Sequence, residues 1–499
     1  MKITSKLGKW KQSEVDALII PMITGEGVPK GLPKFAEQLI SDAIARKEFS
    51  GKAREINHFL VPTVGKKGLR HLIFIGIGKA NDIQSTDFGE VFGRAIRLAQ
   101  AKKASTVGFW YRDVLEEQIE SVRHLAEIIA EYGQMARYEF SEYFKKKKPQ
   151  VKQLTVYIEN KAEQKAIAQG LKIGSTIGKI VNDSRDLCNR PSNKLTPKDV
   201  SLFAKDAGKT DTKLQVKILG EKQMEKLGMG ALLGVSQGSL QEGQFVIAEY
   251  WGAAKKDAPY VVIGKGVTFD TGGISLKPSS SMDEMKFDMC GGAAALGVVR
   301  AISALNLPIN VVALVPAAEN MPGQNAYKPG DVLVAKDGTT IEVLNTDAEG
   351  RLLLADALVY ARDYKPKAVV DLATLTGASA VALHDAAAGM FTDDDELSAA
   401  LDQGGKAAGD LVWRMPMPAR YSDYVKSKVA DIQNIGSTRF GGAITAAIFL
   451  KHFVAKKYPW AHLDIAGLAW SSGGRKHLTP GATGAGIRAC VEWLRAESK

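Results

Sequence analysis

The chain has 499 residues, with 45% hydrophobic and 24% charged side chains and a net charge of +11. This composition is ordinary for a soluble globular protein, and the length predicts two domains or slightly more, because one hydrophobic core rarely grows so large. The N-terminal residues lack the apolar stretch of a signal peptide, and no apolar run approaches the ~20 residues that cross a bilayer. We therefore expect no membrane association.

Three cysteines, Cys188, Cys290 and Cys490, lie far apart and include no CxxC pair. This pattern argues against a disulfide framework or a thiolate zinc site, and it favours a reducing compartment with three small buried thiols. The positive charge is compatible with nucleic-acid binding. However, the charge is spread along the chain, and only Lys145–Lys148 forms a run, which is typical of a solvated loop.

The N-terminal third of the chain alternates segments of strand length with segments of helical periodicity, as α/β units do. The glycine-rich Gly76–Lys79 matches neither the P-loop nor the dinucleotide fingerprint, so we interpret it as a turn. The predicted strands are Ala17–Met22, His71–Ile77 and Ser105–Trp110, and the predicted helices are Phe35–Arg46, Phe88–Ala101 and Leu115–Tyr132.

The pattern breaks at Lys145–Gln153, where four lysines and a proline precede a new predicted strand, Leu154–Glu159. Lys161–Asp186 has helical composition and is followed by the turn cluster Asn189–Asn193. We therefore predict an N-terminal α/β domain at 1–160, a connecting helix at 161–190 and a second domain at 191–499.

The second domain contains continuous apolar runs of strand length between helical segments. Such strands are typical of a sheet that is buried on both faces by helices. Examples are Tyr260–Ile263, Ile309–Val315 and Ala368–Leu372. The fold class is therefore α/β in both domains.

Charged residues gather in two glycine-rich segments of this domain. Lys265 and Asp270 follow directly on the predicted strand Tyr260–Ile263, where open α/β sheets bind ligands. Asp288 lies in a predicted helix, Asp283–Leu305, where a carboxylate is costly unless it is paired or bound to a cation.

The second of these segments is Asn345–Leu352. Asp337 and Gly338 form a hairpin turn between predicted strands Val332–Ala335 and Thr340–Leu344. If the returning strand continues, its alternation directs Asp347 and Glu349 toward one centre. Arg351 then opens the apolar helix Leu352–Tyr364.

Four converging carboxylates repel one another unless cations hold them together. Two divalent ions bridged by Asp270, Asp288, Asp347 and Glu349 form the usual two-metal hydrolytic site. Both segments lack histidine and thiolate ligands, which disfavours a mononuclear histidine zinc site. Taken singly, each acidic residue is more often a turn residue or a helix cap, so the interpretation rests on their combination.

Several motifs resemble those of the leucine aminopeptidase family, also called cytosol aminopeptidases and, in bacteria, PepA. The octapeptide NTDAEGRL at Asn345–Leu352 is similar to the family signature. GKGVTFDTGGISLKP and MDEMKFDMCG occur upstream of it in the family's order, and DLATLTGA, GGAIT and WAHLDIAG follow downstream. The resemblance is close over residues 170–499 and looser before that. Thr483–Gly486 departs from the family's Thr-Gly-Arg-Pro, which puts a C-terminal contact in doubt.

The resemblance implies a metal-dependent enzyme that removes the N-terminal residue, preferably a leucine-like one, from short peptides. Asp270 and Glu349 match carboxylates that bridge two metals, while Asp347 matches a ligand of one metal. Lys265, as a neutral amine, and Asp288 match ligands of the other metal. The ions expected are Zn²⁺ or Mn²⁺, with Mg²⁺ and Co²⁺ as alternatives.

The resemblance also implies a catalytic pair. Arg351 matches an arginine that holds a bicarbonate acting as general base, and Lys277 matches a lysine that stabilises the gem-diolate. Positions around the substrate side chain are matched by Met285, Asn345, Thr374, Gly377 and Ala466. The family fold is a smaller N-terminal, macro-like α/β domain joined by a helix to a larger catalytic α/β domain, and its members form cytoplasmic hexamers.

Two other interpretations compete with this one. The basic charge and the DNA binding of bacterial family members keep a nucleic-acid-binding role open. A catalytically inactive relative is not expected to have all seven metal and catalytic positions, and this sequence has them all.

His462 could suggest a catalytic base, but its buried strand Ala461–Ile465 favours a core histidine with satisfied hydrogen bonds. The acidic run Asp393–Glu396 is expected to be an exposed loop.

Overall fold

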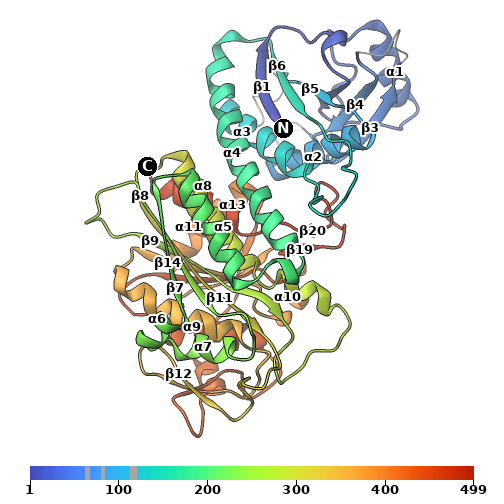
Figure 1. The fold of residues 1–499 in the computed structure, drawn as a ribbon. Coiled ribbons are helices and arrows are strands. Elements are labelled where there is room, and N and C mark those ends of the chain that lie inside the picture. The colour runs from blue at the N-terminus through green and yellow to red at the C-terminus, as the bar shows by residue number, and fades with distance from the viewer. Residues whose placement is uncertain (62–67, 80–84, 113–120) are drawn as a thin grey trace. The chain divides into compact units, whose positions relative to one another are not determined.

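The computed structural model describes residues 1–61, 68–79, 85–112 and 121–499, which form two compact units (Figure 1). Unit 1 contains Met1–Asn182 and Ser472–Pro480. Unit 2 contains Asp183–Ser471 and Gly481–Lys499. Both units combine a β-sheet with helices, so the predicted two-part α/β architecture is confirmed.

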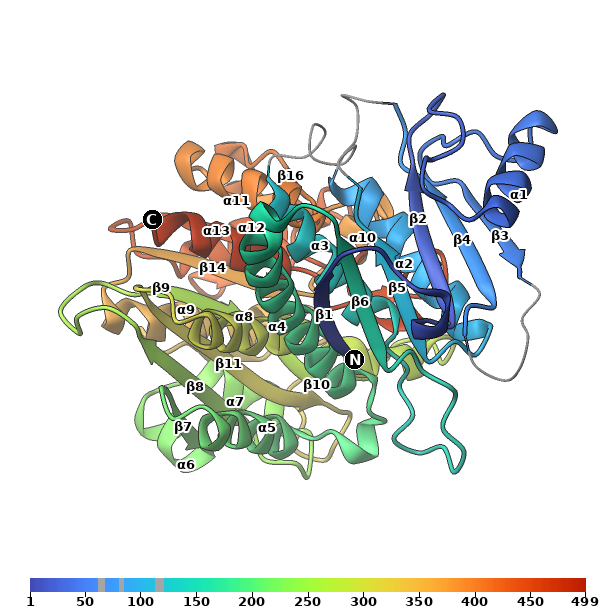
Figure 2. The same cartoon turned by 90° about the horizontal axis from the view of Figure 1, so that it is seen from above.

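Unit 1 is built on a six-stranded sheet of order β1-β6-β5-β2-β4-β3, which Figure 2 shows from β1 to β3. Neighbouring strands are parallel except at the edge, where β3 runs antiparallel to β4. Every residue of β2 and β4 is buried, which explains their continuous apolar sequences. The strands are β1 Lys2–Leu7, β2 Ala17–Met22, β3 Ile56–Leu60, β4 His71–Gly76, β5 Thr106–Trp110 and β6 Gln153–Ile158.

The helices of unit 1 lie close to their predicted positions. They are α1 Lys34–Ala45, α2 Ser85–Ala101 and α3 Val122–Ala136. The first part of the predicted helix Leu115–Tyr132 lies outside the described residues, and Ser121 caps α3 by accepting the His124 N–H. The 26-residue helix α4, Gln164–Asn189, begins in unit 1 and ends in unit 2.

Unit 2 contains a nine-stranded mixed sheet of order β16-β15-β18-β14-β9-β11-β8-β7, with β10 paired to β11. Its centre consists of four parallel strands, β18, β14, β9 and β11, and β10 is parallel to β11. The strands are β7 Leu214–Gly220, β8 Gln244–Trp251, β9 Tyr260–Gly264, β10 Gly266–Asp270, β11 Asn310–Asn320, β14 Ala368–Ala373, β15 Ala388–Phe391, β16 Val412–Arg414 and β18 Trp460–Asp464.

Smaller elements complete unit 2. The predicted hairpin at Asp337–Gly338 is confirmed, since β12 Val332–Val334 pairs antiparallel with β13 Thr340–Glu342. β17 Ile432–Gln433 extends this hairpin, and β19 Trp470–Ser471 pairs with β20 Gly481–Ala482.

The helices of unit 2 are α5 Pro197–Thr210, α6 Glu221–Lys226, α7 Gly230–Ser236, α8 Cys290–Leu305, α9 Gly350–Ala361, α10 Gly377–Leu383, α11 Asp395–Ala408, α12 Gly442–His452 and α13 Ile487–Glu497.

Helices cover both faces of the central sheet. Val261 and Ile263 of β9 pack in one hydrophobic cluster with α7, α9 and α12. On its other face, β9 packs against α8. The contact is so close that a Cβ at Gly264 would lie 2.2 Å from the Gly291 carbonyl oxygen. Because only glycine lacks that atom, Gly264 allows α8 to pack directly against the end of the strand.

Two sequence-based expectations need correction. The predicted helix Asp283–Leu305 is interrupted, because a 3₁₀ turn, Met282–Phe287, precedes α8, and Asp288 lies between them. The acidic run Asp393–Glu396 is not simply a loop, because Asp394 caps α11 and Asp395 lies in its first turn.

Among the described residues, one helical stretch, Met282–Leu305, is long and apolar enough to span a membrane by length and composition alone. Its most apolar window is 83% buried within the protein, as expected for a core helix.

We predict that Leu358→Ala lowers the free energy of unfolding by about 2–5 kcal/mol, because Leu358 of α9 is fully buried in the cluster between α9 and the sheet. Leu240→Ala, at a fully exposed leucine, serves as the matched control and should change stability by less than about 0.5 kcal/mol. Urea denaturation followed by tryptophan fluorescence measures both. Equal effects at the two sites would contradict the described core.

Candidate metal centre and active site

The candidate site lies where the parallel strands of unit 2 end. Lys265 follows β9, Asp270 ends β10, Thr374 follows β14 and Asp464 ends β18. The carboxyl ends of parallel strands lie along one edge of the sheet, so segments distant in sequence meet there. This explains why the two charged glycine-rich segments lie together in space.

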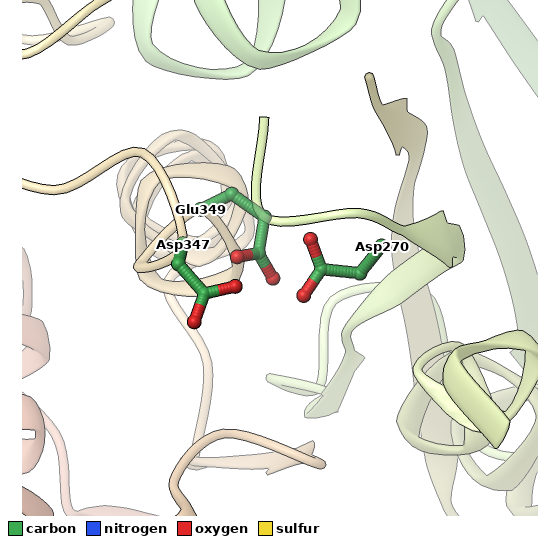
Figure 3. Close-up of side chains that lie close together, drawn as sticks. All are labelled: Asp270, Asp347 and Glu349. Atoms are coloured by element: carbon green, nitrogen blue, oxygen red, sulfur yellow. The ribbon is translucent and has the colours of Figure 1, made fainter. Parts of the chain in front are cut away.

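Asp270, Asp347 and Glu349 form the centre of this site. Each offers a carboxylate oxygen within 4.8 Å of the others, and Figure 3 shows the three groups directed toward one another. Asp270 and Glu349 are only 2% and 1% exposed. Such close, dry carboxylates repel strongly unless positive charge is supplied.

The segment that carries Asp347 and Glu349 does not continue as a strand, contrary to the sequence-based interpretation. Strand β13 ends at Glu342, Asp347 lies in a turn, and Glu349 has helical dihedral angles at the start of α9. The two side chains therefore meet because the chain turns into a helix. Alternation along a strand is not the cause.

Thr346 fastens this turn to the loop after Asp270. Its hydroxyl donates to the Gly272 carbonyl oxygen at 2.6 Å and accepts the Ser275 N–H at 2.8 Å. Its own N–H donates to the Ser275 hydroxyl at 3.1 Å. These bonds fix the two charged segments relative to each other.

Lys265 and Asp288 extend the cluster on one side. The Lys265 ammonium lies 2.8 Å from Asp288 Oδ1 and 2.9 Å from Glu349 Oε1, and it donates to the Thr374 carbonyl oxygen at 2.8 Å. The Thr374 hydroxyl donates to the same Asp288 oxygen at 2.8 Å. Thr374, predicted near the substrate side chain, is thus in direct contact with the candidate ligands.

Lys277 contacts the two other carboxylates of the cluster. Its ammonium is 2.8 Å from Asp270 Oδ2 and also forms an ion pair with Asp347. Its side chain is 22% exposed, compared with 4% for Lys265. Of the two lysines, Lys277 is therefore the more accessible to a molecule that enters the site from solvent.

Arg351 is held by a residue that the sequence did not indicate. Its guanidinium Nη1 donates to the Asn434 carbonyl oxygen at 2.8 Å, while Nε is buried without a hydrogen-bond partner among the described residues. The Asn434 side chain also binds the turn, accepting the Leu344 N–H and donating to the Asn345 carbonyl oxygen. No motif marks Asn434 in the sequence, because it lies far from the charged segments.

The remaining candidates for substrate contact lie on surrounding segments. Met285 is in the 3₁₀ turn before Asp288, and Gly377 is the exposed first residue of α10. The Asn345 side chain accepts the Asp347 N–H at 2.8 Å, and the Ala466 N–H donates to Asp464 at 3.2 Å. Their roles in substrate binding stay predictions.

The electrostatics of the cluster follow from its burial. Burial raises the pKa of Asp270, and the Glu349 charge adds to this increase. Burial also raises the pKa of Asp288 well above its usual value. Burial opposes the charge on Lys265, but Asp288 and Glu349 outweigh it and raise the pKa of the ammonium. Burial lowers the pKa of Arg351 to about 10.

The donor set fits hard divalent cations. Four carboxylates are opposed by two lysines, and carboxylate oxygens are ligands for Mn²⁺, Mg²⁺ and Zn²⁺. Among the described residues, Asp288 Oδ2 and Glu349 Oε2 are buried without a hydrogen-bond partner. Buried carboxylate oxygens rarely stay unpaired, so these two are available for ions.

His462 lies in β18 within the core, as expected, and its Nδ1 is 2.6 Å from Asp371 Oδ1. The Trp460 indole N–H donates to the other Asp371 oxygen at 2.7 Å. The expectation of full hydrogen bonding holds only for Nδ1, because Nε2 has no partner within the described parts of the chain. Burial opposes protonation, but Asp371 outweighs it and raises the pKa of His462.

Comparison with known proteins assigns the chain to a family. The model of the cytosol aminopeptidase family catalytic domain matches residues 182–491, and that of the family's N-terminal domain matches residues 25–148. The chain belongs to the cytosol aminopeptidase family. The enzyme is therefore a peptidase that acts at peptide N-termini, and the resemblance of its motifs is confirmed.

Relatives cover almost the whole enzyme. It is 42% identical over 501 residues to a probable cytosol aminopeptidase of Roseiflexus castenholzii, covering 99% of both chains. It is 45% identical to one from Saccharophagus degradans, covering 87% of both chains.

Two solved structures resemble the enzyme in fold. One is a mutant of tomato leucine aminopeptidase, with a TM-score of 0.86, 32% identity and coverage of 99% of this chain and 96% of that one. The other is the bottromycin maturation enzyme BotP in complex with Mn, with a TM-score of 0.84, 31% identity and coverage of 97% and 100%.

We predict that Gly350→Ala lowers aminopeptidase activity by about 10²-fold, because a misplacement near 1 Å at a reacting group has this effect. The added Cβ would lie 2.4 Å from Lys265 Cε, which forces the lysine away from Asp288 and Glu349. Gly220→Ala is the control, since its Cβ meets no atom within 4 Å. Turnover of leucine p-nitroanilide measures the effect, and unchanged turnover in Gly350→Ala would contradict the described packing.

Proposed function

We propose that the enzyme is a two-metal aminopeptidase that removes leucine-like residues from the N-termini of short peptides. The observation that carries this proposal is the convergence of Asp270, Asp347 and Glu349 within 4.8 Å, beside Asp288 and Lys265. Asp270 and Glu349 would bridge two ions, and Asp347 would bind one of them through its side chain and carbonyl oxygen. Asp288 would bind the other together with Lys265, which would act as a neutral amine because two nearby dications disfavour its ammonium form.

The bound ions supply Lewis-acid polarisation of the scissile carbonyl and a lowered pKa for water. The Lys277 ammonium, which contacts Asp270 and Asp347 in this structure, would be free to contact the substrate when those carboxylates hold ions. Lys277 then donates to the scissile carbonyl oxygen and stabilises the gem-diolate charge. Arg351, with its buried and unpaired Nε, would hold a bicarbonate as the general base.

The first test of this proposal is Glu349→Gln, which removes one proposed bridging charge while keeping the side-chain shape. Hydrolysis of leucine p-nitroanilide should fall to the background rate. The metal content of the protein, measured by mass spectrometry, should also decrease. Glu225→Gln, at an exposed residue of α6, should change neither. Chelation of the wild-type protein should abolish activity, and Zn²⁺ or Mn²⁺ should restore it. Full turnover by Glu349→Gln would contradict the mechanism.

A second test separates metal binding from stabilisation of the transition state. Lys277→Met should lower kcat by about 10²–10³-fold, as loss of an oxyanion donor does, while metal content stays at the wild-type value. Lys226→Met, on the exposed end of α6, is the control. An unchanged kcat, or a loss of bound metal, would show that Lys277 does not act on the substrate.

Further properties are proposed from family membership. We expect Zn²⁺ or Mn²⁺ as the ions, with Mg²⁺ or Co²⁺ as alternatives, a cytoplasmic location and a homohexamer. The presence of Mn in the BotP complex supports a manganese-compatible site in a relative of the same fold. Metal analysis of purified protein and analytical ultracentrifugation determine the ions and the assembly.

An additional role in binding nucleic acid remains a separate proposal. It rests on the net charge of +11 and on Lys145–Lys148, whose four lysines are exposed as expected. Salt-sensitive retention on DNA that persists in Asp347→Asn would support this role, because electrostatic binding does not need the metal cluster. Absence of retention at low salt would exclude it.

A further inference from the structure

Asn320 lies directly beside the proposed metal cluster and has no role in the mechanism so far. It is the last residue of β11, and it pairs in register with Asp270, the last residue of β10. Its side chain is fully buried, at 0% exposure. Its amide Nδ2 donates to Asp270 Oδ1 at 2.8 Å and to the Thr346 carbonyl oxygen at 2.9 Å. One amide group therefore joins the two charged segments.

The orientation of this amide is determined by its partners. A carboxylate and a carbonyl oxygen are both acceptors, so only the NH₂ end of the amide can face them. The opposite end, Oδ1, is buried without a hydrogen-bond partner in the described part of the protein. The two bonds donated by Nδ2 therefore fix the position of the amide.

The bond from Asn320 determines which oxygen of Asp270 faces the cluster. Asp270 Oδ1 accepts from both Asn320 Nδ2 and the Gly272 N–H, each at 2.8 Å. Asp270 Oδ2 contacts the Lys277 ammonium in the cluster. With Oδ1 held by two donors, the carboxylate cannot rotate without breaking both bonds.

The second bond of Asn320 acts on the other charged segment. The Thr346 carbonyl oxygen also accepts from the Tyr327 hydroxyl at 2.8 Å, so two buried donors hold the residue before Asp347. Through Asn320, the position of Asp270 is therefore tied to that of the segment carrying Asp347 and Glu349.

We propose that Asn320 is a positioning residue that orients Asp270 toward the metal pair and sets its spacing from Asp347 and Glu349. The inference rests on the proposed two-metal function. Partners that orient metal ligands typically contribute 10–100-fold to metal affinity or activity. Asn320 should therefore contribute to ion affinity as well as to filling space in the core.

The decisive variant is Asn320→Leu, which has nearly the same shape but no hydrogen-bonding groups. The Asp270 Oδ1 atom and the Thr346 carbonyl oxygen each keep one other donor in this variant, from Gly272 and Tyr327. The Asn320 backbone carbonyl also keeps its bonds from the Thr271 N–H and hydroxyl. Asn320→Ala is the second variant, which removes the same bonds and leaves a cavity.

Asn310→Leu provides a matched control at the other end of the same strand. Asn310 is also buried, and its Nδ2 also donates two bonds, to the carbonyl oxygens of Ala254 and Asp257 at 2.8 and 2.9 Å. Ten residues of strand separate it from Asn320, which corresponds to about 33 Å. The Asn310 Oδ1 also accepts the Ala253 N–H at 3.0 Å. The control therefore reports the general cost of losing a buried amide, and it removes one hydrogen bond more than Asn320→Leu does.

The experiment measures Mn²⁺ dissociation constants by electron paramagnetic resonance of the free ion, alongside the Tm of each metal-free protein. Both Asn320 variants should bind Mn²⁺ about 10–100-fold more weakly, and the Mn²⁺ concentration for half-maximal activity should rise by the same factor. Asn310→Leu should lower the metal-free Tm without changing Mn²⁺ affinity.

Different outcomes separate the two proposals. If the wild-type protein binds no Mn²⁺ or other divalent ion, the proposed two-metal function is wrong. If the wild-type protein binds Mn²⁺ and both Asn320 variants retain its affinity within about twofold, or if Asn310→Leu loses as much affinity, the positioning role is overturned. A loss in Asn320→Ala alone would show that Asn320 only fills space, and it would also overturn the inference.

Discussion

The structure of unit 2 depends on the repulsion among carboxylates that are buried together. Asp270, Asp347 and Glu349 lie close together, and the Lys265 ammonium forms ion pairs with both Glu349 and Asp288. Water screens the buried charges of Asp270, Asp288 and Glu349 only weakly, so each must be compensated by a nearby cation or hydrogen-bond donor. In the described structure Lys265 and Lys277 provide that compensation, and each contacts two carboxylates. Ions of higher charge fit the same geometry.

The fold places these groups together by ending its central parallel strands at one edge. That arrangement needs very close packing between helices and strands. Gly264 lets α8 approach the end of β9, and Gly350 leaves the volume that the Lys265 side chain occupies. Glycine is required at both positions because any Cβ would overlap neighbouring atoms. The glycines of the charged segments thus provide space for the site, in addition to allowing tight turns.

Two buried amides link the segments that form the site. Asn320 and Asn434 each bridge segments that are far apart in sequence, and both are fully buried. An amide can donate and accept without adding charge, which suits it to a site where the charge balance is already demanding. Family membership identifies the enzyme as an aminopeptidase, and these contacts join the segments that carry its candidate metal ligands.

Much of this protein could be predicted from its sequence. The strand Ala17–Met22 has the same bounds in the structure, and β9, β14 and the hairpin at Asp337–Gly338 lie within a residue or two of their predicted positions. These elements are continuous in sequence, so their local apolar pattern and turn residues are sufficient to predict them. The signature NTDAEGRL was likewise sufficient to predict the family.

Other features were decided only by the tertiary structure. Local periodicity predicted one helix through Asp288 and a strand through Glu349. In the structure the helix is interrupted at Asp288, and the segment with Glu349 leads into α9. In both cases contacts with distant segments outweigh local preference. Asn320 and Asn434 carry no signal in the sequence, because their partners lie 26 to 90 positions away. The sequence thus determined the chemistry available to the enzyme, and long-range packing determined which atoms meet.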